Sequence, residues 1–333
     1  MLCETLGSRL DRTTPLGRRI LDWPERRVAG EDALPLRLAG GLHALARRGS
    51  VPALAALYPP HAEPDPDALW RAVTATIAAA GDELTSWLDW PPQTNEEARA
   101  AAFMTGLLVV ADRTNLPIAL HELGCSAGLN LMLDRFAYRL GELSCGAAQS
   151  PVRLAPGWTG PSPPNAEVRI QRRRGIDLTP LDDTDAGDRE RLLAYVWADQ
   201  TERLARATAA IAIAAADPPT VDRGDAADWL EAQVAIAPET GVARVMLHSI
   251  ALQYMPAFGR ERIATHAARV GAAATSNAPF AWLAYEIDPT WNHRTVLRLR
   301  LWPDGAETIL ATGDPHARQF DWLVGAPPPA GSG

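Results

Sequence analysis

The stretch Ile118-Ala-Leu-His-Glu122-Leu-Gly124-Cys-Ser126-Ala-Gly128-Leu-Asn130 decides the fold that this sequence predicts. It opens with an apolar run, continues through small residues and leads into a helical pattern, which is typical of a strand, a loop and a helix. Open α/β sheets bind ligands in such loops, at the carboxyl ends of strands. Because glycine lets a backbone approach a ligand closely, we interpret this loop as a ligand site. A plain strand-to-helix turn is the alternative.

Several kinds of ligand loop compete for these residues. A dinucleotide fingerprint that begins at Gly124 needs glycine at Ser126 and Leu129, and a phosphate-binding P-loop needs a lysine that is absent. S-adenosylmethionine carries no phosphate, so it needs only close backbone approach and an acidic group for its ammonium end, which Glu122 supplies. The same residues also spell G-x-S-x-G, the turn that carries the nucleophile of α/β-hydrolases. The loop by itself leaves both of these interpretations open.

Short apolar runs alternate with helical patterns after Pro117, which predicts βα units around a parallel sheet. The expected strands are Ile118 to Leu123, Val168 to Ile176, Thr220 to Arg223, Ala243 to His248 and Phe280 to Glu286. The expected helices are Leu129 to Phe136, Asp188 to Ala216, Ala226 to Ala235 and Gly259 to Ala274. A final hairpin is predicted from Val296 to Trp302 and Thr308 to Ala311, around Pro303-Asp304-Gly305. The fold class is therefore α/β, with a mostly parallel sheet and an antiparallel end.

The first 115 residues have helical spacing and no convincing alternating strand. One helix is predicted over Leu36 to Arg47, and a second opens with a capping box between Thr94 and Glu97. Residues 1–115 are expected to form a helical region that covers the crevice and selects the substrate. The sheet domain follows over residues 116–324, with Pro151 to Asn165 as a surface connection and residues 325–333 as a flexible tail.

The composition excludes several classes of protein. The chain has 333 residues, 47% of them apolar, and a formal charge of −8, which gives no general attraction for nucleic acid or anionic lipid. No segment is apolar for long enough to span a bilayer. Cys3, Cys125 and Cys145 are odd in number and widely spaced, which disfavours a disulfide framework and a zinc site. We expect a cytoplasmic protein with no leader sequence, no metal and no nucleic-acid or membrane partner.

Acidic residues follow the predicted strands at the positions where a nucleoside would lie. Asp177 ends the second strand, where carboxylates accept hydrogen bonds from ribose hydroxyls. Asp225, followed by Ala226, comes after the third strand and can accept the exocyclic amine of adenine. The fourth strand ends in His248, whose imidazole can take a proton near neutral pH.

With these residues the chain resembles the class I S-adenosylmethionine-dependent methyltransferases over about Leu116 to Leu323. The segment from Glu122 to Gly128 looks like their first motif, and Gly175 to Pro180 looks like the segment after it. Gly224-Asp225-Ala226 looks like the adenine-contacting motif, and Leu247-His248-Ser249 like the motif that borders the substrate. The resemblance implies a Rossmann-like fold and S-adenosylmethionine as cofactor. The implied cofactor contacts are Glu122, Gly124, Ser126, Gly128, Asp177, Asp225 and Ala226.

Three features depart from that pattern. Ser126 stands where the usual motif has its middle glycine, and an insertion lengthens the chain between Gly128 and Asp177. The second strand is also far more basic than a buried central strand should be, with Arg169, Arg172, Arg173 and Arg174. The whole chain is also similar to a bacterial family of uncharacterised proteins that is known only as a domain of unknown function. That similarity rests on Leu34 to Leu38, Gln93 to Glu96, Glu122 to Leu131, Arg174 to Asp182 and Val196 to Gln200, and it implies no activity.

The acceptor is expected to be a small molecule, with His248 and Tyr254 as candidate catalytic residues that assist its deprotonation. Each has a structural alternative, since a histidine at a strand end is often a satisfied structural group and the tyrosine ring can simply pack. Further residues are expected around the acceptor or over the cofactor: Gln93, Asn95, Glu286, Trp291 and His293.

Two functions of other classes stay open. A serine hydrolase would use Ser126 with Asp225 or Asp288 and with His293 or His316, but that fold needs several strands before its nucleophile. A non-catalytic protein could keep the cofactor pocket or its shape for binding, since a fold does not entail a chemistry.

Overall fold

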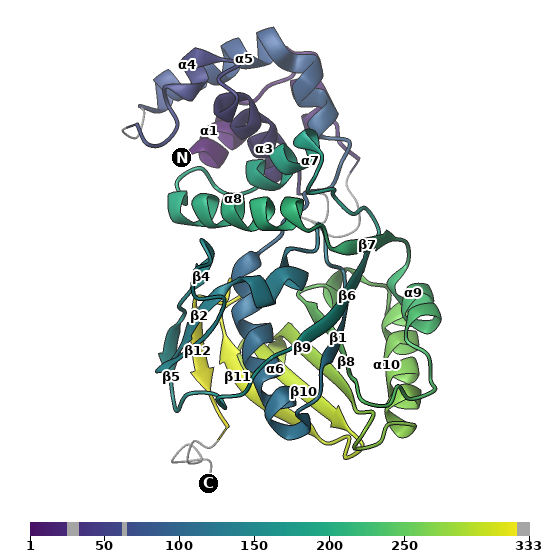
Figure 1. Cartoon of the computed structure of the whole chain (residues 1–333). Helices are drawn as coiled ribbons and strands as arrows, with labels where there is room; N and C mark the ends of the chain where they lie inside the picture. Colours follow the sequence, from purple (N-terminus) through teal and green to yellow (C-terminus); the bar gives the residue numbers. More distant parts are fainter. Residues whose placement is uncertain (25–32, 62–64, 325–333) are drawn as a thin grey trace. The chain divides into compact units, whose positions relative to one another are not determined.

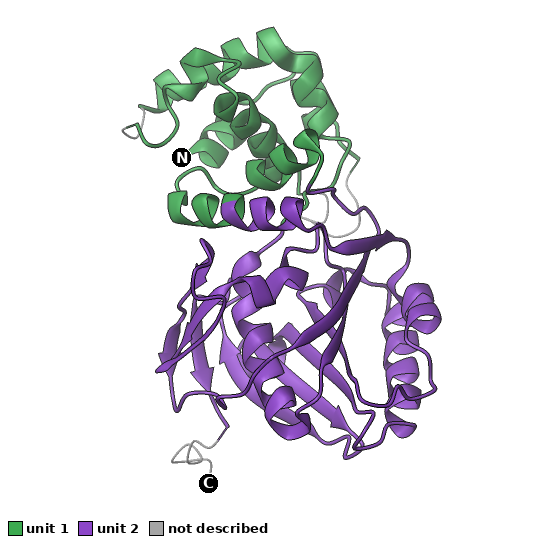
Figure 2. Ribbon diagram, viewed as in Figure 1, with its two compact units in different colours: residues 1–94, 184–208 green, residues 95–183, 209–333 purple. Residues whose placement is uncertain are grey.

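The computed structural model describes residues 1–24, 33–61 and 65–324, so the predicted tail over residues 325–333 lies outside the described residues (Figure 1). The chain forms two compact units (Figure 2). Unit 1 comprises residues 1–94 and 184–208, and unit 2 comprises residues 95–183 and 209–333. This division differs from the expected boundary at residue 115, because helix α6 (Ala100–Thr114) packs on strands β9 and β10 of unit 2.

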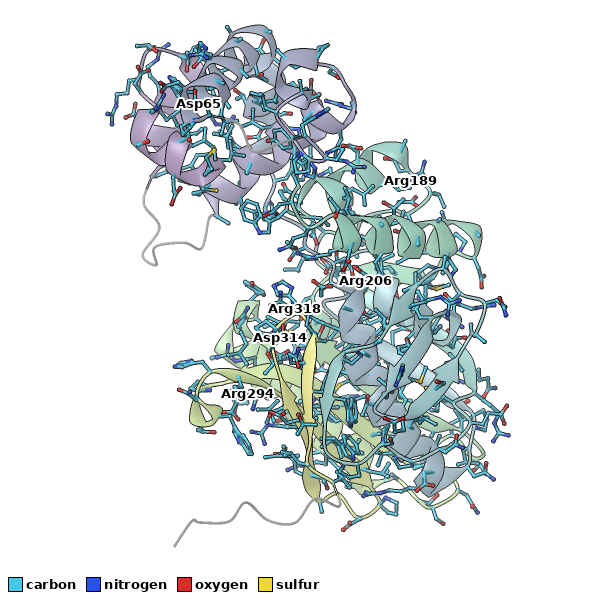
Figure 3. All side chains as sticks on the ribbon, turned by 90° about the vertical axis from the view of Figure 1, so that its left-hand side faces the viewer. Asp65, Arg189, Arg206, Arg294, Asp314 and Arg318 are labelled. Atoms are coloured by element: carbon cyan, nitrogen blue, oxygen red, sulfur yellow. The ribbon has the colours of Figure 1, made fainter. Side chains whose placement is uncertain are left out.

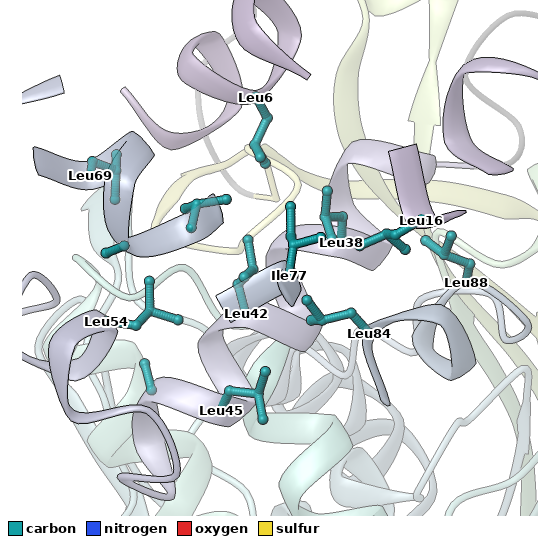
Figure 4. Packing of buried hydrophobic residues seen from close by; sticks show 13 residues of the cluster. Leu6, Leu16, Leu38, Leu42, Leu45, Leu54, Leu69, Ile77, Leu84 and Leu88 are labelled. Atoms are coloured by element: carbon teal, nitrogen blue, oxygen red, sulfur yellow. The ribbon is translucent and has the colours of Figure 1, made fainter. Parts of the chain in front are cut away.

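Unit 1 is helical throughout its described residues. Its elements are α1 (Leu2–Arg9), α2 (Pro15–Leu21), α3 (Leu34–Arg47), α4 (Pro52–Ala55), α5 (Pro66–Trp87), α7 (Ala186–Ala194) and the first part of α8 (Thr201–Ala216). Apolar side chains at helical spacing form its core, among them Leu38, Leu42 and Leu45 of α3 (Figure 4). The predicted helix over residues 36–47 is confirmed as α3.

Helix α7 joins unit 1 although it begins about 100 residues after α5 ends. His43 of α3 bonds the Ala194 carbonyl through Nδ1 at 3.1 Å. A Cβ on Gly40 would lie 2.7 Å from the Tyr195 ring, so only glycine permits this approach. Asp185 caps α7, and the chain turns at residues 195–200, which splits the predicted helix over 188–216 into α7 and α8.

Unit 2 contains a sheet that has nine strands among the described residues, in the order β5-β12-β11-β10-β9-β8-β1-β6-β7. Its parallel part comprises β1 (Ile118–Leu123), β6 (Ile170–Asp177), β7 (Thr220–Arg223), β8 (Ala243–Ser249) and β9 (Phe280–Asp288). The antiparallel part adds β10 (Arg294–Trp302), β11 (Glu307–Gly313) and β12 (Gln319–Trp322), and β5 (Gly157–Thr159) pairs parallel to β12. The fold is therefore mixed α/β with a large, mostly parallel sheet, and the predicted hairpin is β10–β11.

Helices cover both faces of this sheet. A Cβ on Gly106 of α6 would lie 2.4 Å from Leu283, so α6 packs on the face that Leu283 presents. Phe280 and Trp282 alternate with Leu283 along β9 and pack in the cluster that α9 (Ala226–Gln233) and α10 (Ala257–Ala272) bury. Because side chains of a strand alternate between faces, α9 and α10 lie on the opposite face from α6 (Figure 1).

Several local predictions were wrong in detail. The helix expected over Leu129 to Phe136 is a 3-10 helix, η2 (Leu129–Arg135), because the chain enters a further strand at Ala137. Glu96 rather than Thr94 caps the short 3-10 helix η1 (Glu97–Arg99) that precedes α6. The expected surface connection carries β4 (Arg153–Leu154) and β5, and β4 forms a small sheet with β2 (Ala137–Leu140) and β3 (Leu143–Gly146). Strands of two to four residues are too short to show a period.

Strand β6 is unusually basic, and surrounding carboxylates account for its arginines. Arg173 pairs with Asp134 and Arg174 with Asp222, each at 2.6 Å, and Arg172 pairs with Glu239. The strand lies next to the edge strand β7, where such long side chains reach solvent. The basic run therefore has counter-ions within its own fold.

Candidate functional site

The parallel strands β6, β1, β8 and β9 end at one edge of the sheet. From β1 the chain builds outward through β6 and β7, then returns to place β8 on the other side of β1. In open α/β sheets the crevice for a ligand lies outside the strand ends where the order reverses in this way. The loops after β1 and β8 therefore define the candidate site.

The loop after β1 uses left-handed backbone conformations at Gly124 (φ 68°), Ser126 (φ 55°) and Gly128 (φ 79°). A Cβ on Gly124 would lie 2.8 Å from the Ala251 Cβ in the loop after β8. A Cβ on Gly128 would lie 2.9 Å from Val221. Packing within the chain thus requires both glycines, and the loops after β1 and β8 meet directly at Gly124.

Glu122, in β1, places a buried carboxyl group beside this loop. Its Oε1 accepts one long hydrogen bond from Asn130 Nδ2, at 3.5 Å, and its Oε2 has no partner among the described residues. Burial raises the pKa of Glu122 to about 8. A buried acceptor without a donor costs about 1–3 kcal/mol, so this oxygen favours any ligand that brings a donor.

Two side-chain amide oxygens at the loop after β1 also lack a hydrogen-bond partner among the described residues. Asn95 donates through Nδ2 to the Cys125 carbonyl at 3.2 Å, while its Oδ1 has no partner among the described residues. The Oδ1 of Asn130 is likewise buried and unpartnered there. Buried polar atoms are nearly always hydrogen-bonded, so three unpartnered acceptors around one loop are a local excess of acceptors.

Asp177 and Asp225 occupy the strand-end positions that the sequence predicted. Asp177 ends β6 and accepts hydrogen bonds from the Ser126 N–H at 2.8 Å and the Thr179 N–H at 2.9 Å, so it fixes the loop after β1 despite the long insertion. Asp225 caps α9, accepting from the Ala227 and Asp228 N–H groups through Oδ1. Ala226 is the first residue of that helix. Both aspartates have a structural role that needs no ligand.

His248 is fully buried, and both of its ring nitrogens are in hydrogen bonds within the fold. Trp282 Nε1, which can only donate, bonds His248 Nε2 at 2.8 Å, so that nitrogen accepts. The Nδ1–H then donates to Glu286 Oε1 at 2.7 Å. This arrangement favours a structural role for His248 in place of the predicted general base.

Glu286 belongs to the same network. Its Oε1 also accepts from the Ala251 and Leu252 N–H groups at 3.0 and 3.3 Å, which holds the loop after β8 in place. Burial alone would raise the pKa of Glu286, but the hydrogen bonds from His248 and from the backbone hold it below its usual value. The Oε1 of Glu286 thus has a structural role that needs no substrate.

The remaining predicted residues are scattered. Tyr254, in the 3-10 helix η3 (Leu252–Tyr254), is 79% exposed and lies beyond the loop after β8. Trp291 ends η4 (Pro289–Trp291), and the exposed His293 follows it with a φ of 56°. Gln93 belongs to unit 1, while Asn95 belongs to unit 2. Of this group, only Asn95 is joined to the loop after β1 by a described hydrogen bond.

The structure pairs two residues that sequence analysis did not connect. His316 Nδ1 bonds Glu96 Oε2 at 2.8 Å; the Glu96 side chain is 1% exposed and that of His316 is 43% exposed. The Ala98 N–H donates to the other Glu96 oxygen at 3.3 Å. The polar stretch at residues 93–96 and the histidine were both visible, but a separation of 220 residues conceals their pairing.

The described residues contain no group of three or more His, Cys, Asp or Glu that could hold a metal ion. In the same part of the chain, no helix is both long and apolar enough to cross a membrane. Cys3, Cys125 and Cys145 are free cysteines.

The sheet and its helices place this protein in the mixed α/β class. A family model described as an uncharacterised protein conserved in bacteria (DUF2332) matches residues 1–322, so the chain belongs to that family. No curated protein matches the sequence.

Proposed function

We propose that this chain binds S-adenosylmethionine at the strand ends of β1, β6 and β7 and transfers the methyl group to a small acceptor. The strand order β7-β6-β1-β8-β9 corresponds to the 3-2-1-4-5 order of doubly wound, nucleotide-binding sheets, which supports a Rossmann-like fold. The proposal also rests on the methyltransferase-like residues along these strand ends.

The observation that carries the proposal is the unpartnered Oε2 of Glu122. S-adenosylmethionine presents an ammonium group, and an ammonium supplies three donors and a positive charge. Asn95 and Asn130 add two further unpartnered acceptor oxygens beside the same loop. The residues present therefore suit a cationic donor, and they would be a poor cradle for a phosphate.

The other strand-end residues suit the nucleoside part. Asp177 uses one lone pair of each oxygen for backbone N–H groups, and a carboxylate has about four, so ribose hydroxyls can still donate to it. The Oδ2 of Asp225 accepts neither of the two capping hydrogen bonds. When bound, the cofactor supplies an electrophilic methyl group. The chain's contribution is to bind and orient the two reactants, which is the main source of acceleration in such transfers.

Calorimetric titration with S-adenosylmethionine and S-adenosylhomocysteine tests this proposal. We expect micromolar binding by the wild type and a loss of about a hundredfold, roughly 2.7 kcal/mol, in Glu122→Gln. Glu239→Gln is the matched control, because Glu239 pairs with Arg172 away from the strand ends. No binding by folded wild-type protein would contradict the proposal.

One observation favours a second function. Ser126 has a positive φ of 55°, and a strained backbone at the serine is a property of the nucleophile turn in α/β-hydrolases. The described residues before Pro117 form no strand, whereas that fold has several before its nucleophile. Labelling of the wild type by a fluorophosphonate, lost in Ser126→Ala, would support the hydrolase. Cofactor binding without transfer to any acceptor would support the non-catalytic alternative.

A further inference from the structure

His316 has the geometry of a proton acceptor. Glu96 holds its Nδ1 at 2.8 Å from Oε2 and is itself buried, so the imidazole has a fixed orientation. No hydrogen bond to Nε2 is described, and the side chain is 43% exposed. A histidine in a partly exposed side chain, with one nitrogen on a buried carboxylate and no described hydrogen bond at the other, is arranged to accept a proton there and to be stabilised as an imidazolium.

The loop that carries His316 is held firmly. The Asp314 carboxylate accepts from the N–H groups of His316, Arg318 and Gln319 at 2.8–2.9 Å. Tyr285 donates its hydroxyl to the Asp314 carbonyl at 2.7 Å. Figure 3 shows Asp314 and Arg318 close together in this loop. The imidazole is therefore fixed by its backbone as well as by Glu96.

This histidine lies at the same edge of the sheet as the candidate cofactor site. Strand β11 runs parallel to β9, since each pairs antiparallel with β10, so the loop after β11 lies beside the carboxyl ends of β8 and β9. Arg99 donates to the Pro315 carbonyl at 2.9 Å and to the Ser249 carbonyl, at the end of β8, at 3.5 Å. Asn95, the neighbour of Glu96, bonds the loop after β1. Through Arg99 and Asn95, the surroundings of the His316–Glu96 pair are thus connected to the loops after β8 and β1.

We infer that His316 removes the proton from a hydroxyl group of the acceptor, with Glu96 as the residue that positions it. The acceptor is then a small hydroxyl compound, with phenols favoured, and the inference rests on the proposed function. A phenol with a pKa near 10 keeps its proton at neutral pH and needs a base during attack, whereas a neutral amine already offers a lone pair.

The acceptor oxygen forms a bond to the methyl carbon while the carbon–sulfur bond breaks, and its electron pair stays on sulfur as a neutral thioether. The O–H bond electrons stay on oxygen, and the proton moves to His316 Nε2. The Glu96 carboxylate then faces an imidazolium, which is more favourable than a neutral ring.

Transfer of a labelled methyl group to matched phenols, anilines and thiophenols tests the inference. We expect wild-type protein to methylate phenols. His316→Gln should lower kcat at least a hundredfold, with KM and the Kd of S-adenosylhomocysteine within threefold of wild type. His61→Gln, a change at an exposed histidine of unit 1, should leave kcat unchanged.

Glu96→Gln separates positioning from mere support of the fold. The charged groups around His316 are Glu96, Arg99, Asp314 and Arg318. Without the Glu96 carboxylate the imidazole loses the acceptor that orients it, so kcat should fall while KM and the Kd of S-adenosylhomocysteine stay within threefold of wild type. A role in supporting the fold alone would change KM and this Kd together with kcat.

Three results would overturn the inference: His316→Gln with a third or more of the wild-type kcat, transfer only to anilines or thiophenols, or no phenol methylation by protein that binds S-adenosylhomocysteine. Failure of the folded wild type to bind S-adenosylhomocysteine is a different outcome. It would remove the proposed function, and this inference with it.

Discussion

Two carboxyl groups at the same edge of the sheet, the buried Glu122 and the partly buried Glu286, have opposite surroundings. Glu286 of β9 accepts three hydrogen bonds through Oε1, and its pKa lies below the usual value. Glu122 of β1 accepts one long hydrogen bond, leaves Oε2 without a partner among the described residues and has a pKa of about 8. Only β8 separates the two strands in the sheet.

The difference indicates different purposes for the two groups. Glu286 ties His248 and the loop after β8 together, as expected of a carboxylate that maintains a fold. Glu122 contributes little to the folded chain, because an unpaired buried carboxyl group is unfavourable when ionised. A carboxyl group in this condition is explained best by a ligand that supplies the missing donors.

The largest contrast should appear in stability. Glu286→Ala removes the acceptor of three N–H groups, and we expect a loss of about 3 kcal/mol in the free energy of unfolding. Glu122→Gln should not lower it at pH 7 and should raise it by on the order of 3 kcal/mol, because the wild-type carboxyl group must take up a proton on folding at this pH and a neutral amide need not. Urea unfolding measures both. Equal losses in the two variants would contradict the distinction between the two sites.

The pH dependence of stability should isolate Glu122. Its pKa is raised from 4.5 to about 8, so between these values the native chain binds more protons than the unfolded chain. The stability tied to this proton is present below pH 4.5 and is lost as pH rises through about 8. Relative to Glu122→Gln, the wild type should therefore lose on the order of 3 kcal/mol between pH 5 and pH 8.

The same measurement has an internal check. His121, whose pKa burial lowers to about 4, changes stability in the opposite sense between pH 4 and 6.5, but it is present in both proteins and cancels in the difference. Parallel stability curves for wild type and Glu122→Gln would refute the raised pKa.

A smaller effect is expected where the two loops meet. Gly124→Ala places a Cβ 2.8 Å from the Ala251 Cβ at a φ of 68°, so we expect a loss of about 2 kcal/mol. Gly259→Ala, in the first turn of α10, meets only Pro256 at 4.0 Å and should be neutral or stabilising by up to about 1 kcal/mol. Thermal unfolding of the two variants measures the difference. A Gly124→Ala variant as stable as the wild type would show that the two loops do not pack as described.

Local patterns in the sequence predicted most of the sheet but little of the side-chain pairing. The bounds of β1 and β7 match the strands predicted at residues 118–123 and 220–223. β1 is a buried apolar run with a strong local signal, whereas the partly exposed β7 is bounded by Pro219 and Gly224. The positions of Glu122 in β1 and of Asp177 at the end of β6 follow from the predicted strands, since parallel strands end at one edge. The role of His248 could not be predicted, because Trp282 and Glu286 come from another strand.

The pairing of Glu96 with His316 was harder still to predict from the sequence. It depends on the start of η1 and the loop after β11 meeting at one edge of the sheet, and no local period encodes such a contact. The lack of a partner at Glu122 Oε2 could not be predicted either, because a sequence shows which groups are acidic but not which of them lack hydrogen-bond donors in the fold.

Proton release on ligand binding tests the central claim most directly. At pH 6.5 a carboxyl group with a pKa of about 8 is almost fully protonated, and it must ionise to hold an ammonium group. Titration of S-adenosylhomocysteine in buffers of different ionisation enthalpy should therefore show about one proton released per ligand bound by the wild type, and close to none by Glu122→Gln, which should also bind more weakly. Equal affinity and no proton release in both proteins would contradict the assignment of Glu122 as the ligand's partner.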